Sequence, residues 1–354
     1  MLEYLEHLKT LAIEQSAYKF VFCIPKTEDS AGFFVHEYEN IEAYDLSELT
    51  KMNYSRFNFS KTWLLRKMIH RFQATDVVLI SYDQYFPAFH FLLPRNVNYV
   101  SFLYYLYIYD WKKLSIKDKI RNVVNYFLLV NNRAVSQILI CNGSNERILL
   151  NKIYKTRKFV NIVDPISIDV THSTKKKHTK KTFLHLGVLG IRKGTLEILD
   201  AITMLNAEQC DKVRFIFAGI VTEEIKQVFY EHVEVLKSKV EICIADRFCS
   251  YHEIINYCQE SDFLLMPYSG TSQSSGMLAY ASAFNLPVIA TDKGMIKKLV
   301  KKNRLGYLIQ NDSNSIRDMV VKLMDKAPMQ VSRVYVEKNS IEEFNNTFRT
   351  CFNS

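Results

Sequence analysis

The chain has 354 residues, of which 48% are hydrophobic and 23% charged, and its formal net charge is +9 at pH 7. These values exclude general disorder and favour about two globular domains. The seven cysteines are irregularly spaced without a CxxC pair, which argues against a disulfide framework or a zinc site. Residues 1–15 do not resemble a signal peptide, and no apolar run reaches the ~20 residues of a membrane span. We therefore expect a cytoplasmic protein.

Basic and aromatic segments indicate which partners to consider. Residues 171–181 and 292–304 are rich in lysine, which favours phosphates, acidic lipid head groups or nucleic acid, although a solvated loop and helix face would look alike. The aromatic segment 99–111, followed by Lys112 and Lys113, could graze a membrane interface. We favour a buried strand and its exit loop instead, because strands covered on both faces read as continuous apolar runs.

In chain order, short apolar runs alternate with helical patterns. The first series comprises strands at 18–24, 40–46, 75–81, 96–102, 136–142 and 158–164, with the clearest helices at 116–132 and 144–154. After a polar stretch at 168–181 come strands at 182–188, 213–219, 239–245, 261–267, 287–291 and 306–310, with helices starting near Thr195, Ser250 and Ser313 and a last helix at 340–352. This alternation predicts an α/β protein with two Rossmann-like, doubly wound domains and a cleft between them.

The strand at 182–188 leads into the segment LHLGVLGIRKGTLEILDAI. Gly190 lies in the loop after this strand, and Arg192 and Lys193 lie where the next helix begins. Helix N-termini bind anions, a lysine suits phosphate as a point charge, and an arginine can grip two oxygens at once. Neither GxxxxGK[ST] nor GxGxxG is present, which disfavours ATP hydrolysis and a nicotinamide cofactor. We predict a phosphate site here; the alternative is a plain strand-to-helix turn with surface cations.

A second helix entrance, in PYSGTSQSSGMLAY, is rich in hydroxyl groups and has no carboxylate. Ser272, Ser274 and Ser275 precede the helix, and Gly276 would let a ligand approach the backbone. Together with Lys193, the backbone amides at 274–276 would suit a diphosphate. The alternative is ordinary helix capping with small residues for close packing.

The order of these segments resembles the donor domain of the retaining GT-B glycosyltransferases of family 4 (group 1), which transfer sugars from nucleotide sugars. The match runs through residues 182–325, from LGVLGIRKGTLEILDAITML to LGYLI, and residues 138–166 resemble the end of the acceptor domain of that family. The resemblance implies the GT-B fold and a UDP- or GDP-sugar as the donor substrate, with no further cofactor.

The resemblance also implies roles for individual residues. Lys193 matches the lysine that holds the donor phosphates, and Arg192 would compensate for an arginine that the family commonly has where this chain has Val188. The amides of residues 274–276 match the loop that contacts phosphate and sugar. Arg247 and Phe248 lie where the family packs the nucleobase.

The chain departs from the family at its E-x7-E pair. The two glutamates, which usually contact the donor sugar and the ribose hydroxyls, are replaced by Ser272 and Tyr280. We interpret the hydroxyl-rich loop at residues 270–275, called here the hydroxyl loop, as a neutral phosphate and sugar cradle that uses backbone amides and serine side chains in place of carboxylates.

The resemblance sets the expected domains. Residues 1–167 form the acceptor-side domain, 168–181 the linker, 182–335 the donor domain, and 336–354 a helix that crosses back to the first domain. The first domain begins with a helical pattern, so either it lacks the usual first strand or the chain starts downstream of that strand.

The acceptor half offers fewer candidates. Asp83 follows the strand at 75–81 and is a candidate catalytic residue, with helix capping as its alternative, and His90 in the next helix is more typical of a core histidine. A retaining transfer needs mainly positioning and stabilisation of the leaving diphosphate. No DxD motif lies in a suitable loop, so we expect no metal.

These features favour a cytoplasmic glycosyltransferase at the inner face of the plasma membrane, with a glycan or lipid-linked saccharide as acceptor, in bacterial surface polysaccharide synthesis. Two alternatives remain open: a catalytically inactive GT-B sugar-nucleotide or glycan-binding protein, and a sugar-nucleotide 2-epimerase. Nucleic acid is not expected as a partner, because the sequence has no helix-turn-helix, zinc-finger or RNP signature.

Overall fold

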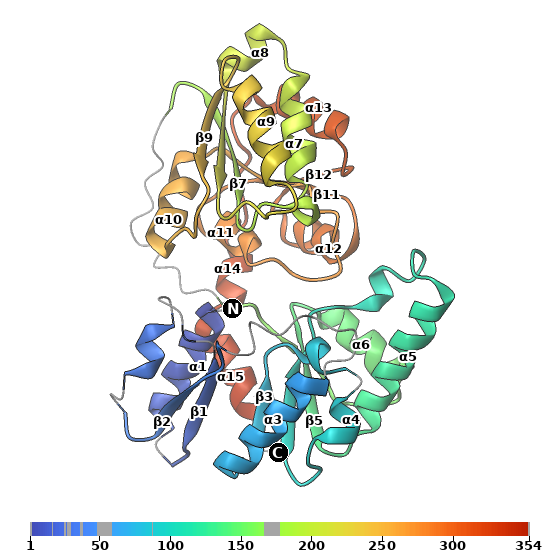
Figure 1. The fold of residues 1–354 in the computed structure, drawn as a ribbon. Helices are drawn as coiled ribbons and strands as arrows, with labels where there is room; N and C mark the ends of the chain where they lie inside the picture. The colour runs from blue at the N-terminus through green and yellow to red at the C-terminus, as the bar shows by residue number, and fades with distance from the viewer. Residues whose placement is uncertain are drawn as a thin grey trace. The chain divides into compact units, whose positions relative to one another are not determined.

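The computed structural model divides the chain into two compact units, each described here by itself (Figure 1). Unit 1 comprises Met1–Pro165 and Ile341–Ser354, and unit 2 comprises Ile166–Ser340. The structure describes residues 2–352 except 16, 25, 27–29, 36–37, 48–58, 87 and 166–177. Three lysines of the basic run at 171–181 therefore lie outside the described residues. Among the described helices, none is both long and apolar enough to cross a membrane.

Unit 1 is an α/β unit whose strands are divided between two parallel sheets. Its strands are β1 (Phe20–Ile24), β2 (Ile41–Asp45), β3 (Asp76–Leu79), β4 (Asn98–Phe102), β5 (Val135–Cys141) and β6 (Phe159–Ile162). Its helices are α1 (Leu2–Glu14), η1 (Ala31–Phe34), α3 (Phe59–Phe72), η2 (Tyr82–Tyr85), α4 (Phe89–Leu92), η3 (Tyr107–Tyr109), α5 (Ile116–Asn131), α6 (Ser144–Ile153) and α15 (Ile341–Thr350). One sheet has the order β1-β2 and the other β3-β4-β5-β6. The strands come where the apolar runs predict them.

The last helix, α15, belongs to unit 1 although the whole of unit 2 separates it in sequence from the other elements of unit 1. Phe344 and Phe348 lie on one face of α15 and join a core with Val100, Leu139 and Ile162 from β4, β5 and β6. The ring of Phe348 stacks on that of Phe102 with a centroid distance of 6.4 Å. The apolar side chains at positions 341, 344 and 348 follow the helical period, which is why this segment can bury one face against a sheet.

Unit 2 is one α/β domain built on a single parallel sheet. Its strands are β7 (Lys181–Leu186), β8 (Val213–Ala218), β9 (Glu241–Ala245), β10 (Phe263–Met266), β11 (Val288–Thr291) and β12 (Gly306–Ile309). Its helices are η4 (Ile191–Lys193), α7 (Thr195–Thr203), α8 (Ala207–Lys212), α9 (Lys226–Leu236), α10 (Tyr251–Glu260), α11 (Met277–Ala283), α12 (Gly294–Asn303), α13 (Ser313–Leu323) and α14 (Val334–Lys338). Helices cover both faces of the sheet in Figure 1.

The strand order of unit 2 determines where a ligand can bind. The sheet runs β12-β11-β10-β7-β8-β9, so the first strand of the unit, β7, lies in the middle. The next two strands lie on one side of β7, and the last three lie on its other side. This is the 3-2-1-4-5-6 order of doubly wound sheets, whose ligands bind at the carboxyl ends of the strands where the order reverses. In unit 2 that point lies between β7 and β10, whose residues pair at Phe183–Phe263 and Leu184–Leu264.

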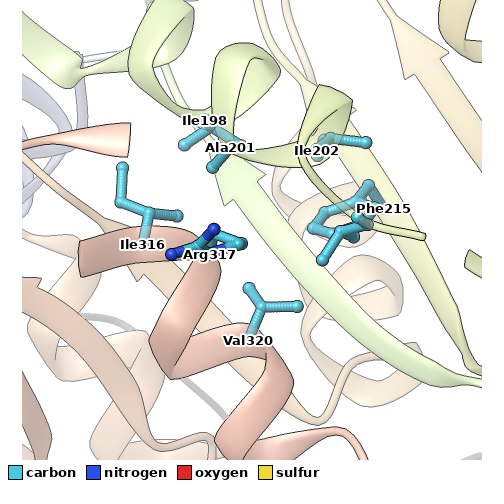
Figure 2. A pocket seen from close by; sticks show the side chains of 8 residues that line it. Ile198, Ala201, Ile202, Phe215, Ile316, Arg317 and Val320 are labelled. Atoms are coloured by element: carbon cyan, nitrogen blue, oxygen red, sulfur yellow. The ribbon is translucent and has the colours of Figure 1, made fainter. Parts of the chain in front are cut away.

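Away from that point, a crevice lies between α7 and α13 (Figure 2). Ile198, Ile202, Phe215, Ile316 and Val320 line it, and the only charged group among its lining residues is Arg317, which pairs with Asp318. The lining aliphatic groups belong to the core of unit 2. We therefore interpret this crevice as a packing feature between two helices.

We predict that Phe344→Ala destabilises unit 1 by about 3–5 kcal/mol, because Phe344 is fully buried and its removal leaves a cavity in the core. Phe352→Ala is the matched control, since that ring is 36% exposed and its loss should change stability far less. Urea unfolding followed by circular dichroism measures both variants. Equal midpoints for the two variants would show that α15 does not carry part of the core.

Candidate functional site

The candidate site is built on close backbone contacts at the carboxyl end of the unit 2 sheet. A Cβ atom added to Gly219, after β8, would lie 1.9 Å from the carbonyl oxygen of Gly187, after β7, so only glycine fits there. The Gly187 N–H in turn donates to the carbonyl of Ala218, and the Leu189 N–H donates to that of Ile220. The loop after β7 is therefore hydrogen-bonded to the segment that follows β8, beyond the end of the sheet.

A second close contact holds the short helix η4 against the end of β10. Gly194, which follows η4, has φ +73°, and a Cβ added there would lie 2.2 Å from the carbonyl oxygen of Pro267. Both the left-handed backbone and the contact require glycine at this position. This close contact places Lys193 beside Tyr268, the residue that follows Pro267.

Lys193 is held by an aromatic side chain, Tyr268. Its Nζ donates a hydrogen bond of 2.8 Å to the Tyr268 hydroxyl and lies 4.0 Å from the ring centroid. Tyr268 is buried, and Thr291 at the end of β11 donates a 2.8 Å hydrogen bond to its carbonyl. The ammonium group therefore sits at the reversal point between β7 and β10, on a buried support, as a phosphate-binding cation would need.

Arg192 lies on the same loop and contacts the loop after β10. Its carbonyl accepts a 3.0 Å hydrogen bond from the Ser269 N–H. A Cβ added to Gly270 would lie 3.0 Å from Cγ of Arg192, so the arginine side chain passes close to this glycine. The side chain is exposed. The structure thus brings Arg192 and Lys193 together with the start of the hydroxyl loop.

The hydroxyl loop is anchored on its other side by α12. The Met295 N–H donates to the carbonyl of Thr271 at 2.8 Å, and Gly294, with φ +60°, lets the two backbones approach. Thr271 and Ser272 are buried, whereas Ser274 and Ser275 are half-buried at the entrance of α11. A Cβ added to Gly276 would meet no atom within 4 Å, so the space beside this residue is open.

Tyr280 of α11 is buried, so its side chain does not form part of an open binding surface. Its side chain is only 4% exposed, and its ring packs 6.3 Å from that of Tyr251. Ser272 is also buried. The two positions that the resemblance equates with the E-x7-E glutamates are thus packing positions, and their contact with a donor stays a prediction.

Arg247 and Phe248, after β9, differ in their freedom to meet a ligand. Arg247 donates a 2.9 Å hydrogen bond to Oε2 of Glu253 and pairs with Oε1 as well, and the same carboxylate caps α10 through the Ser250 N–H. The hydrogen bond from Arg247 lowers the pKa of Glu253 to about 2. Phe248 is 61% exposed. Phe248 is therefore the more available partner for a nucleobase.

The unit 1 candidates are less informative. Asp83 lies in η2, and its side chain is outside the described part of the structure. His90 makes a 3.0 Å hydrogen bond with the buried Tyr82, and burial lowers the pKa of His90 to about 4. The contacts of its ring with Phe86 and Phe89 are those of a core histidine.

A buried histidine beneath the β7 loop was missed by sequence reasoning. Nδ1 of His185 lies 3.1 Å from the carbonyl oxygen of Leu265, and Nε2 lies 3.0 Å from Oγ1 of Thr195. A neutral ring donates from Nδ1 to that carbonyl and accepts from the Thr195 hydroxyl. His185 thus joins β7, β10 and the first residue of α7.

Other contributors were also missed. Tyr268 supports Lys193, and Thr222 and Glu224 lie beside Gly190, where an added Cβ would be 2.9 Å from Oγ1 of Thr222 and 3.2 Å from Oε1 of Glu224. Tyr268 follows the strand at 261–267, so its place at a strand end was the one available signal. Nothing in the sequence pattern pairs Gly190 with the loop after β8.

The second half of the chain matches a known protein family. Residues 169–340 match the family described as Glycosyl transferases group 1, so this stretch is a group 1 glycosyltransferase domain. No curated protein matches the sequence. The family match covers the whole of the site in unit 2 and confirms the resemblance to group 1 glycosyltransferases.

Solved structures agree on the fold. HepE (Alr3699) of Anabaena, in complex with UDP and glucose, superposes with a TM-score of 0.67 at 12% identity over 98% of this chain and 95% of that chain. WaaG, a glycosyltransferase involved in lipopolysaccharide biosynthesis, gives 0.65 at 12% identity over 98% and 94%. A glycosyltransferase from Rickettsia africae gives 0.61 at 15% identity over 98% and 90%. The chain thus has the GT-B fold, and its domain places it among the glycosyltransferases.

We predict that Gly194→Ala lowers the stability of unit 2 by at least about 1 kcal/mol, because alanine is strained at this positive φ and meets the Pro267 carbonyl. Gly276→Ala is the control, since its added methyl group enters open space. Thermal unfolding followed by calorimetry compares them. A melting temperature for Gly194→Ala equal to that of the control would contradict the contact.

We predict that His185 makes unit 2 less stable in acid. Burial, with a smaller effect of the Lys193 charge, lowers the pKa of His185 to about 4 in the folded state, against about 6.5 when unfolded. The stability that the neutral ring provides is therefore complete above about pH 6.5 and is lost as the pH falls towards 4, at up to about 1.4 kcal/mol per pH unit.

The measurement is the melting temperature of unit 2 between pH 7 and 4. His185→Asn, which keeps a donor near Nδ1 but cannot titrate, should flatten this dependence. His252→Asn, at an exposed histidine of α10, should leave it as in the wild type. An unchanged slope in His185→Asn would refute the assignment.

Proposed function

We propose that this protein transfers a sugar from a nucleotide-diphosphate sugar to a glycan or lipid-linked saccharide acceptor. The observation that carries the proposal is Lys193 held on Tyr268 at the reversal point of the unit 2 sheet, with Arg192 and the hydroxyl loop beside it. Two adjacent cations beside a hydroxyl-rich helix entrance suit a diphosphate.

We propose UDP- or GDP-sugar as the donor class. Phe248 offers an exposed ring on which a base can stack, whereas Arg247 is occupied by Glu253. The similarity to HepE, whose structure contains UDP and glucose, supports a uridine nucleotide as the first ligand to test. Gly190 lies beside Glu224, a carboxylate that could take over recognition of a hydroxyl group from the missing glutamates.

In the proposed reaction, the bond between the anomeric carbon and the diphosphate oxygen breaks, and its electron pair stays on the diphosphate. The acceptor hydroxyl oxygen forms the new bond to the anomeric carbon on the same face, and its proton passes to the leaving diphosphate. Lys193 and Arg192 stabilise the charge that develops on the leaving group. Because these groups supply the positive charge, we propose that transfer needs neither a metal nor a cofactor. Asp83 remains the candidate catalytic residue of unit 1.

The proposed setting is bacterial surface polysaccharide synthesis at the cytoplasmic face of the plasma membrane. The similarity to WaaG, described as involved in lipopolysaccharide biosynthesis, and the basic character of the chain support this setting. A lipid-linked acceptor would require peripheral contact with an anionic membrane.

A second candidate is a GT-B protein that binds a sugar nucleotide or glycan without transferring it. The buried Ser272 and Tyr280, where the resemblance expects two glutamates, favour this candidate. A 2-epimerase, the remaining alternative, is disfavoured by the same missing carboxylates. Release of UDP or GDP in the presence of an acceptor distinguishes transfer from binding, and isomerisation of the free donor would indicate an epimerase.

We predict that Lys193→Ala weakens UDP or GDP binding by about 10- to 100-fold, because a hydrogen bond to a charged group contributes about 1.5–3 kcal/mol. Isothermal titration calorimetry measures the affinity. Lys237→Ala, at an exposed lysine of unit 2 paired with Glu234, is the control and should bind normally. Absence of nucleotide binding by the wild-type chain, or normal binding by Lys193→Ala, would overturn the proposal.

A further inference from the structure

Helix α5 of unit 1 carries an apolar stripe on its outer surface. The stripe, called here the α5 face, consists of Ile116, Ile120, Val123, Val124 and Phe127, all exposed, with Ile116 77%, Ile120 60% and Phe127 57% exposed. The spacing i, i+4, i+7, i+8, i+11 places these side chains on one side of the helix, within an arc of about 100°. An aliphatic surface of this kind on a folded unit marks an interaction site.

The α5 face is separate from the side of the helix that packs on unit 1. Asn122, Tyr126, Leu129 and Val130 are the buried residues of α5, and they lie on an adjacent arc. Tyr126 donates a 2.6 Å hydrogen bond to the carbonyl of Tyr105, and its ring stacks on that of Tyr154. Among the described residues, α5 therefore packs on unit 1 through this buried arc and not through the α5 face. In Figure 1, α5 lies at the edge of this unit.

The segment around α5 has an excess of positive over negative charge. Residues 111–158 contain eleven Lys and Arg residues but only two acidic ones, Asp118 and Glu146, whereas the remainder of the chain has 35 of each sign. The whole net charge of +9 thus belongs to this segment of 48 residues. The lysine runs at 171–181 and 292–304 are balanced by acidic residues elsewhere in the remainder of the chain.

Cations flank the α5 face on both sides. Lys117 and Arg121 follow the stripe along one edge and Lys119 lies along the other, while Lys112 and Lys113 precede the helix and are exposed. Long basic side chains in this arrangement can place their ammonium groups at a polar surface while the apolar stripe sinks below it. Trp111, 41% exposed, lies at the same end and has Lys119 5.4 Å from its ring centroid.

We propose that the α5 face is the surface by which this protein docks on an anionic lipid bilayer, with α5 lying in the plane of the interface. This inference rests on the proposed function, because it identifies the surface for the peripheral membrane contact proposed above. A bilayer of acidic lipids binds both the apolar stripe and the cations beside it. The apolar side chains enter the acyl boundary, and the cations contact the head groups. Nucleic acid or an acidic glycan would reward only the charge.

The first experiment is sedimentation of the full chain with vesicles of phosphatidylcholine containing 30% phosphatidylglycerol, and with vesicles of phosphatidylcholine alone. We expect binding to the anionic vesicles that weakens as salt is added and little binding to the neutral ones. Ile120→Ser with Phe127→Ser should weaken binding at least about tenfold. Lys112→Ala with Lys113→Ala should weaken binding to the anionic vesicles about fivefold per lysine at low salt.

Matched controls separate the α5 face from general charge and apolarity. Lys301→Ala with Lys302→Ala removes two exposed lysines of α12, and Val235→Ser removes an exposed valine of α9; both should bind vesicles as the wild type does. Lys193→Ala should also bind vesicles normally while losing nucleotide. Failure of docking can therefore be told from failure of the donor proposal.

The second readout uses tryptophan fluorescence, since the chain has two tryptophans, Trp63 and Trp111. In Trp63→Phe, anionic vesicles should shift the emission of Trp111 to shorter wavelength, and brominated lipids should quench it. Binding that survives the two serine substitutions, no vesicle binding, or no change at Trp111 would each overturn the proposal. So would a dimer in ultracentrifugation that the serine substitutions abolish, since the α5 face would then be a self-association surface.

Discussion

The candidate site depends on the contact between the left-handed Gly194 and the carbonyl of Pro267. A side chain on Gly194 would stand 2.2 Å from that oxygen, so the short helix after β7 can rest on the end of β10 only through a glycine. This approach places Lys193 over Tyr268 and Arg192 against Gly270. Because β7 and β10 are neighbours at the reversal of the strand order, one backbone contact delivers both cations to the place where doubly wound sheets bind ligands.

The supports of the site are neutral and buried, while its cations are accessible. His185 and Thr291 donate to backbone carbonyls beneath the loops, and the Thr195 hydroxyl donates to the His185 ring. Tyr268 offers its ring and hydroxyl to Lys193. A carboxylate beside Lys193 would have neutralised the charge that a diphosphate needs. The absence of glutamate at positions 272 and 280 is consistent with this arrangement, in which hydroxyl groups and amides surround the cations.

We propose that two separate positive features serve two different kinds of anion. The pair at Arg192 and Lys193 is small and held by specific contacts, which suits one diphosphate. The excess around α5 is spread over 48 residues beside an apolar stripe, which suits an extended surface of acidic lipids. A donor that dissolves in water and an acceptor that is anchored to lipid would use these features together.

The sequence by itself determined the positions of the strands in the described part of the chain, the α/β class and the helix entrance at Arg192 and Lys193, because apolar period, glycines and cations are local signals. It also placed the helix pattern at 340–352, whose buried phenylalanines meet the sheet of unit 1. Only the tertiary structure decided that Tyr268 supports Lys193, that Glu253 occupies Arg247 and that Tyr280 is buried. Each of these depends on residues from different strand ends or helices, and contacts of that kind are set by strand order and packing, which no local pattern in the chain encodes.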